Sequence, residues 1–171
     1  MILLIFVLVL VLLFAVQTTF LELFSVGGVM PDLALIFVVY CGIHFLRNGG
    51  IGVGVLVGFI QDCLSGALFG VNTLSKGLTG LFFSALKDKI IVKGILPISF
   101  FLVATSLFDG VIYFSALTSL MGAQIKGDFM FSRILVFAVF NAVAGLFLFY
   151  VLDAGRQQLH RKFPNQVLRS T

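Results

Sequence analysis

Residues 49–72 read GGIGVGVLVGFIQDCLSGALFGVN, an apolar, glycine-rich stretch with a carboxylate, Asp62, near its middle. A carboxylate inside a membrane costs roughly 2.5–3.5 kcal/mol even on the lenient insertion scales. Gly50, Gly54 and Gly58 precede it at every fourth position, so Asp62 continues the face of the helix that they form. A stripe of small residues lets another helix approach closely, and it indicates helix packing more often than a binding surface.

The whole chain has the composition of an integral membrane protein. Of its 171 residues, 60% are hydrophobic and only 11% are charged, and the mean hydropathy is +1.19. A soluble domain carries about a quarter charged residues. The apolar runs are unbroken and do not alternate with a period of two, so they predict helices and not a membrane β-barrel.

Six hydrophobic segments predict an all-α integral membrane protein built as a six-transmembrane-helix bundle. They cover about residues 1–20, 32–46, 50–66, 72–86, 95–121 and 133–153. Crossing a hydrocarbon core of about 30 Å takes about 20 helical residues, so the second and fourth segments are short. We expect these two to stand upright or to sit where the protein thins the bilayer. Pro31 is expected to begin the second segment, where its missing N–H costs nothing.

The first segment is interpreted as a retained helix and not as a cleaved signal peptide. No Lys or Arg precedes its apolar run, and Ala15-Val16-Gln17 is a poor cleavage site.

The basic residues predict that both termini face the cytoplasm. In this orientation Lys76, Lys126 and Arg133 fall toward the outside. The other basic residues lie on the cytoplasmic side, which is the asymmetry that the positive-inside rule describes. They are Arg47, Lys87, Lys89, Lys93, Arg156, Arg161, Lys162 and Arg169. The predicted organisation is a transmembrane domain over residues 1–155 and a basic cytoplasmic tail over residues 156–171.

Polar side chains are expected to form a layer inside the bundle. Counting about 1.5 Å per residue places Asp62 and Asp109 each roughly 20 Å deep, and Asn141 at a similar depth. A structural network, a polar pocket for a ligand or partner segment, and a proton relay remain open interpretations. The relay is least favoured because no Lys, Arg or His is expected at this depth. Without a cation, at least one acid is expected to be protonated, since burial disfavours the charged form.

The sequence gives no sign of catalysis or of a cofactor. It contains none of the common hydrolase, metalloprotease or phosphate-binding motifs, and no metal or nucleic-acid site is predicted. His44 and His160 fall at cytoplasmic positions, away from the expected layer. Cys41 and Cys63 are expected near opposite faces of the bilayer, so we predict that they are buried, small apolar residues without a disulfide.

The run Gly54-x3-Gly58-x3-Asp62-x2-Ser65-Gly66-x3-Gly70-Val71 resembles the central signature of the MreD family of rod shape-determining proteins. The resemblance covers essentially the whole chain, and Gly145 stands in a segment where relatives often carry a proline. It implies that Gly66 and Gly70 join the helix-packing glycines. Further matching pieces follow in the family's order: Gln17, Pro31-Asp32-Leu33, Leu107-Phe108-Asp109, Asn141 and Arg156-Gln157-Gln158.

The resemblance implies a non-enzymatic scaffold of the bacterial cell-elongation complex, or elongasome, which carries out peptidoglycan synthesis. Its implied partners are MreC, a single-span protein, and nearby MreB, RodA and the transpeptidase partner of RodA, with lipid of the inner membrane around it. The family's fold is similar to the substrate-binding subunits of energy-coupling-factor transporters. The alternative function is therefore such a subunit for a small molecule of the vitamin type, in which Asp62, Asn72 and Asp109 would contact a polar ligand.

Overall fold

The computed structural model describes residues 2–19, 25, 27–44, 50–66, 68–86, 94–122 and 127–162. Within these ranges the chain forms helices and no strand, which confirms the predicted all-α class. The helices are α1 (Ile2–Thr19), α2 (Leu33–His44), α3 (Gly50–Ser65), α4 (Val71–Leu86), α5 (Ile95–Met121) and α6 (Gly127–Lys162).

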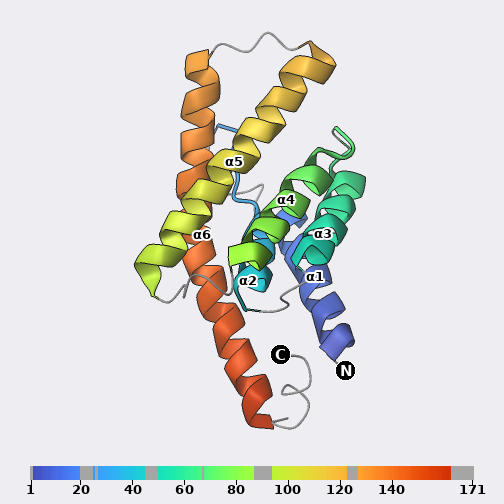
Figure 1. Cartoon of the computed structure of the whole chain (residues 1–171), viewed down its shortest axis with the longest axis vertical. Helices are drawn as coiled ribbons and strands as arrows, with labels where there is room; N and C mark the ends of the chain where they lie inside the picture. Colours follow the sequence, from blue (N-terminus) through green and yellow to red (C-terminus); the bar gives the residue numbers. More distant parts are fainter. Residues whose placement is uncertain are drawn as a thin grey trace.

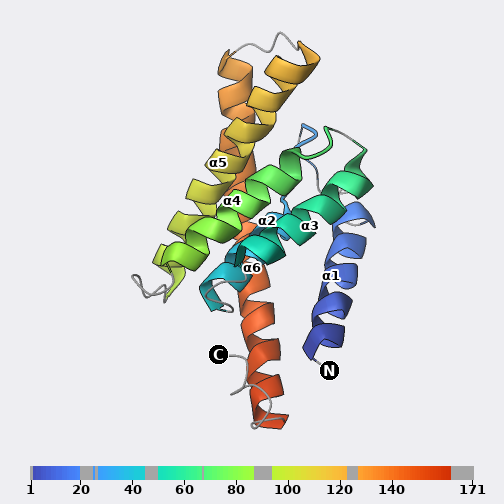
Figure 2. The same cartoon turned by 45° about the vertical axis from the view of Figure 1, so that its right-hand side comes forward.

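Two helix pairs enclose a short central helix (Figure 1, Figure 2). The α3 and α4 helices pack closely along one another, and α5 and α6 form a second, much longer pair. Between them, α2 contacts each of the other five helices. Its 12 residues are almost all buried, from Leu33 through Gly42. The core of the molecule is therefore built around α2.

Local sequence signals explain where the long helices begin and end. The α5 helix ends at Gly122, which has a φ of 63° and donates its N–H to the carbonyl of Leu117. This left-handed conformation suits glycine, which has no Cβ to clash. The α6 helix begins at Gly127, with Asp128 favourably placed in its first turn. It continues through Lys162, past the predicted domain boundary at residue 155.

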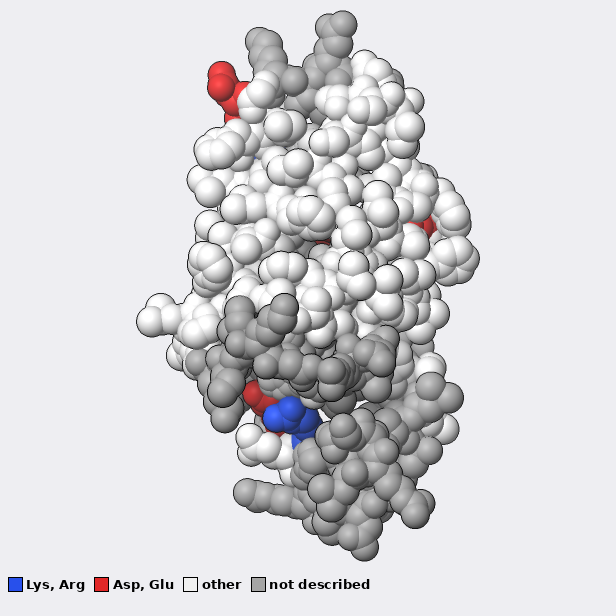
Figure 3. Space-filling view, viewed as in Figure 1, with Lys and Arg blue, Asp and Glu red and all other residues white. Residues whose placement is uncertain are grey.

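In the part of the chain that the structure describes, two helices are long and apolar enough to cross a membrane, over Ile95–Leu120 and Gly127–Gln158. The apolar helices α1, α2 and α3 are shorter. Many large apolar side chains of α1, α5 and α6 are exposed, and the described residues on the face in Figure 3 are almost entirely uncharged. This surface is what a lipid environment requires, and it would be unstable in water.

Polar contacts also join the C-terminal end of α2 to α6. The carboxylate of Asp153 accepts a hydrogen bond from the hydroxyl of Tyr40 at 3.1 Å, and it lies 3.3 Å from Nε2 of His44. The ring of Tyr40 packs edge-on against Phe149, with centroids 5.1 Å apart. These contacts hold α2 and α6 together, and none of them involves a residue of the expected polar layer.

The two cysteines are not bonded to each other in the structure. Cys41 is buried, but Cys63 is exposed, and the prediction that both are buried is wrong. Cys63 lies on a side of α3 that no other described helix covers. Several basic residues behind the predicted orientation lie outside the described residues: Arg47, Lys87, Lys89, Lys93, Lys126 and Arg169.

Candidate functional site

The glycine stripe of α3 faces α4. A Cβ atom added at Gly54 or Gly58 would overlap backbone atoms of α4, and one added at Gly50 would also overlap the side chain of Ser84. The three glycines therefore allow the two backbones to approach more closely than larger residues would permit. This close approach brings Asp62, one turn after Gly58, against the first turn of α4.

Asp62 caps the N-terminus of α4. Its Oδ2 accepts hydrogen bonds from the backbone N–H of Gly70 (3.0 Å) and from both the N–H (2.9 Å) and the hydroxyl (2.6 Å) of Thr73. Its Oδ1 accepts from the N–H (3.1 Å) and the side-chain amide (3.0 Å) of Asn72. The first N–H groups of a helix have no acceptor within the helix, and that end carries a positive dipole. A carboxylate from the preceding helix satisfies both requirements.

Gly66 and Gly70 shape the turn between α3 and α4. Both have a positive φ, 59° and 94° respectively, and a Cβ atom at either position would meet no neighbour. The expectation that they pack helices is therefore wrong. Glycine suits these positions because it adopts this backbone conformation without strain, and the turn can then direct the N–H of Gly70 at Asp62.

Lys76 lies inside the bundle, between two carboxylates. Its side chain is fully buried, with Nζ 2.9 Å from Oδ2 of Asp32 and 3.6 Å from Oδ1 of Asp109. It also donates to the amide oxygen of Asn72 at 3.0 Å. The prediction that no cation lies among the acids is wrong, because Lys76 lies there, buried inside the bundle.

Asp32, at the start of α2, contacts side chains from four other helices, α1, α3, α4 and α6. One oxygen accepts from the side-chain amide of Gln61 at 3.1 Å, and the other from that of Gln17 at 3.5 Å and from the N–H of Leu35 at 3.0 Å. The bond to Leu35 makes Asp32 the N-cap of α2. Pro31 therefore lies outside the helix. The expectation that it begins the second helical segment is wrong.

Asn141 extends these contacts to the long helix pair. Its amide oxygen accepts from the N–H of Asp32 at 2.7 Å, and its NH₂ group donates to the hydroxyl of Ser106 at 2.9 Å. On the same face of α5, Asp109 accepts a hydrogen bond from the hydroxyl of Ser75. The α6 helix is thus bonded to the start of α2, the α5 helix to the second turn of α4, and α5 and α6 to each other.

These contacts form one continuous polar network that includes residues from five helices and the N-cap of α2. Its members are Gln17, Asp32, Gln61, Asp62, Asn72, Thr73, Ser75, Lys76, Ser106, Asp109 and Asn141. The expected layer residues Asp62, Asn72, Asp109 and Asn141 all lie in it. Asp62 and Asp109 are joined through Asn72 and Lys76 rather than in direct contact. Ser65 is exposed and lies apart, with its hydroxyl on the carbonyl of Asp62.

Sequence reasoning missed Lys76, although a signal was present. Asn72, Ser75, Lys76 and Thr79 follow the spacing i, i+3, i+4 and i+7, which places them on one face of a helix. In α4 this polar face points inward: Ser75, Lys76 and Thr79 are buried, whereas Leu74 and Leu78 are exposed. A polar face inside an otherwise apolar bundle indicates an internal network.

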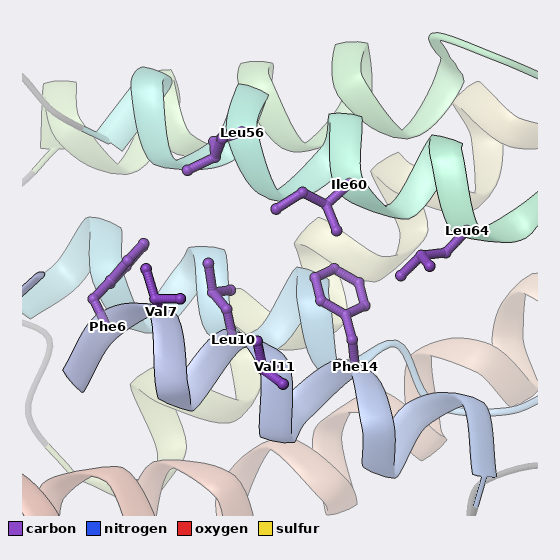
Figure 4. A pocket seen from close by; sticks show the side chains of 8 residues that line it. All are labelled: Phe6, Val7, Leu10, Val11, Phe14, Leu56, Ile60 and Leu64. Carbon is purple, nitrogen blue, oxygen red and sulfur yellow. The ribbon is translucent and has the colours of Figure 1, made fainter. Parts of the chain in front are cut away.

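Among the described atoms of the network, Oε1 of Gln61 is buried without a hydrogen-bond partner. An apolar groove of about 440 Å³ lies between α1 and α3, lined by aliphatic and phenylalanine side chains that face one another (Figure 4). None of its lining residues belongs to the polar network: Phe6, Val7, Leu10, Val11, Phe14, Leu56, Ile60 and Leu64. Within the described ranges, no group of His, Cys, Asp and Glu side chains could hold a metal ion.

Comparison with known proteins identifies one family. The model of the rod shape-determining protein MreD matches residues 1–154. No curated protein and no solved structure matches the chain, and the expected similarity to energy-coupling-factor subunits stays a prediction.

Proposed function

Since this chain belongs to the MreD family of rod shape-determining proteins, we propose that it is a scaffold of the cell-elongation complex that binds MreC through a rigid helix bundle. Membership gives the chain a role in rod shape determination and a membrane-associated location, in a family that is not catalytic. The scaffold role and the binding of MreC are the steps that we add.

The observation that carries the proposal is the way the polar network uses its own hydrogen-bonding groups. Asp62 accepts five hydrogen bonds from α4, and Lys76 contacts Asn72, Asp32 and Asp109. Side chains occupied in this way fix helices relative to one another, whereas a transport site needs groups that turn toward a ligand. No contact in the described part of the chain favours the transporter alternative.

Six spans with cytoplasmic termini are the topology that we propose for this scaffold in the bacterial inner membrane. The first turn of α1 and the last turns of α6 lie toward the same end of the molecule in both views, which supports an even number of crossings (Figure 1, Figure 2). The exposed apolar side chains of α1, α5 and α6 would face lipid or the span of MreC. MreB, RodA and its transpeptidase partner would lie nearby in the elongasome.

The test compares two substitutions on α6 by copurification from native membranes in mild detergent. Asn141→Leu removes a buried member of the network, and Val143→Leu changes a lipid-exposed position two residues away. We expect Asn141→Leu to lower both thermal stability and the yield of MreC, and Val143→Leu to change neither. If the parent chain recovered an ATPase module and a coupling subunit in place of MreC, the scaffold proposal would be wrong.

A further inference from the structure

The long and short helices of this bundle reach different heights, and the polar network shows by how much. The N–H of Asp32, at the start of α2, is bonded to Asn141 in the middle of α6. From Asn141, α6 continues toward its N-terminus past Arg133, which lies about 12 Å further along the axis. The N-terminal end of α2 therefore lies well short of the N-terminal end of α6 along the axis of α6.

A second contact gives the same result for α4 and α5. Ser75, in the second turn of α4, is bonded to Asp109. Beyond Asp109, α5 continues through Met121, about 18 Å further. Both views show the α5–α6 pair extending well past the turn between α3 and α4 (Figure 1, Figure 2).

The short helices are also shorter than the hydrocarbon core of a membrane is thick, whereas the long helices are not. The 27 residues of α5 give about 40 Å of helix, enough to cross a hydrocarbon core of about 30 Å. The 16 residues of α3 or α4 give about 24 Å, and the 12 of α2 about 18 Å. In Figure 2, α3 and α4 are also inclined to the axis of α6, which shortens their reach further.

The turn at the ends of the short helices cannot lie in hydrocarbon. Irregular backbone at membrane depth is tolerated only where protein or water covers it. Gly66 and Gly70 have open space around their Cα atoms, and the neighbouring Ser65 is exposed. Polar surroundings at this level on the α3–α4 side would solvate this backbone, with the exposed ring of Phe69 at the headgroup boundary, while the apolar surface of α5 and α6 still needs lipid chains at the same height.

We propose that the protein thins the outer leaflet over the ends of α2, α3 and α4, so that phospholipid headgroups lie about 10 Å deeper there than beside α5 and α6. The chain would thus carry an asymmetric surface for the lipid bilayer, with a step between its short and long helices. The proposal goes beyond scaffolding, although it uses the membrane-spanning arrangement proposed above.

Two exposed positions at matched height provide the test. Cys63 adjoins Asp62, which is bonded to Thr73. Thr73 lies half a turn from Ser75, toward the N-terminus of α4. Val111 lies half a turn beyond Asp109, the partner of Ser75. Both side chains are exposed. In a flat bilayer they would lie at similar depths.

The measurement is fluorescence quenching in dioleoyl phosphatidylcholine vesicles that contain only this chain. A nitrobenzoxadiazole dye is attached either to Cys63 or to a cysteine in a Val111→Cys/Cys63→Ala variant, both with Cys41→Ala. Nitroxide lipids carry the quencher at the headgroup or at the middle of the acyl chain. Leu64→Cys and Tyr113→Cys, also at exposed positions of similar height, form a second pair if labelling disturbs the first.

We expect headgroup quenching at position 63 and acyl-chain quenching at position 111, with inferred depths that differ by roughly 10 Å. Acyl-chain quenching at both positions, or headgroup quenching at both, would overturn the proposal. Because MreC is absent from the vesicles, the result does not depend on partner binding.

Discussion

Among the described residues no cation contacts Asp62, and five hydrogen bonds from the start of α4 stabilise its carboxylate inside the apolar bundle. All five donors belong to Gly70, Asn72 and Thr73, so one side chain fixes the whole first turn. The question raised by the sequence has a local answer: the glycines bring α4 close, and Asp62 then satisfies its open N-terminus.

Replacing Asp62 should therefore destabilise the bundle according to how many donors lose their acceptor. Asp62→Leu leaves buried N–H groups unsatisfied, at about 1–3 kcal/mol each, whereas Asp62→Asn retains one accepting oxygen and should be milder. The unfolding temperature in detergent and the yield of copurified MreC should both fall, slightly in Asp62→Asn and more in Asp62→Leu. Ser65→Ala, on the same helix but outside the network, is the control. Loss of cell-shape function in Asp62→Asn with stability and MreC binding intact would show that the charge itself is functional.

Substitution of Lys76 should lower the stability of the bundle more than substitution of the partly exposed Arg156. Lys76→Met leaves Asp32 and Asp109 buried without their cation, and breaking a buried ion pair in this way costs about 3–5 kcal/mol. Arg156→Met removes the same charge from a partly exposed pair with Asp153 and should cost about 1 kcal/mol or less. Thermal unfolding in detergent compares them. Equal stability of the two variants would mean that Lys76 does not stabilise the network.

Adding Asp109→Asn to Lys76→Met provides an internal check. The second substitution removes one of the two unpaired carboxylates, so the double variant should be more stable than the sum of the single effects predicts. Additive losses would indicate that Lys76 and Asp109 do not interact in the membrane.

At the scale of helices, the pairing of α3 with α4 depends on missing side chains. Gly54→Ala should weaken it, because the new methyl group would overlap the backbone of Lys76 and Gly77, and overpacking of this kind costs typically 1–3 kcal/mol. Gly52 lies two residues away with open space around it. Gly52→Ala should be neutral or slightly stabilising, since alanine favours helix over glycine. Unfolding temperatures in detergent report the difference, and a loss in Gly52→Ala equal to that in Gly54→Ala would refute the packing role.

The sequence predicted the helices better than the contacts between them. Unbroken apolar runs gave the bounds of the first five helices to within a few residues, because length and hydrophobicity decide where a helix can lie in lipid. The start of α6 was missed by six residues, since Asp128 and Arg133 suggested a loop. In the helix, Asp128 lies in the favourable first turn and the guanidinium of Arg133 lies over the ring of Phe129.

For the molecule as a whole, the predicted topology can be tested at Lys87 and Lys126, two positions outside the described residues. Lys87→Cys and Lys126→Cys, in a background without Cys41 and Cys63, should react with a membrane-impermeant maleimide from opposite sides. In intact spheroplasts only the cysteine at position 126 should be labelled, and lysis should expose position 87. Labelling of both in intact spheroplasts would exclude six spans with cytoplasmic termini.

The polar network could be predicted only in part. Asp62, Asp109 and Asn141 stood out because each interrupts an apolar run, and similar depths suggested a shared layer. Lys76 was assigned to the outer side, because counting charges by loop ignores a lysine that turns inward within a helix. Which acid contacts which donor depends on the rotation of each helix about its axis, and an apolar chain of this kind leaves that rotation to packing.

The burial of Lys76 also has a consequence for biosynthesis. An isolated α4 would enter the bilayer carrying a lysine, which costs about 2.5–3.5 kcal/mol near a helix centre. When α4 enters the bilayer, Asp109 has not yet reached the membrane, whereas Asp32 already has. The nascent chain can therefore lower this insertion cost only if α2 stays beside the translocon until α4 arrives. The order of synthesis thus makes the central helix the early binding partner of a charge that α5 encloses last.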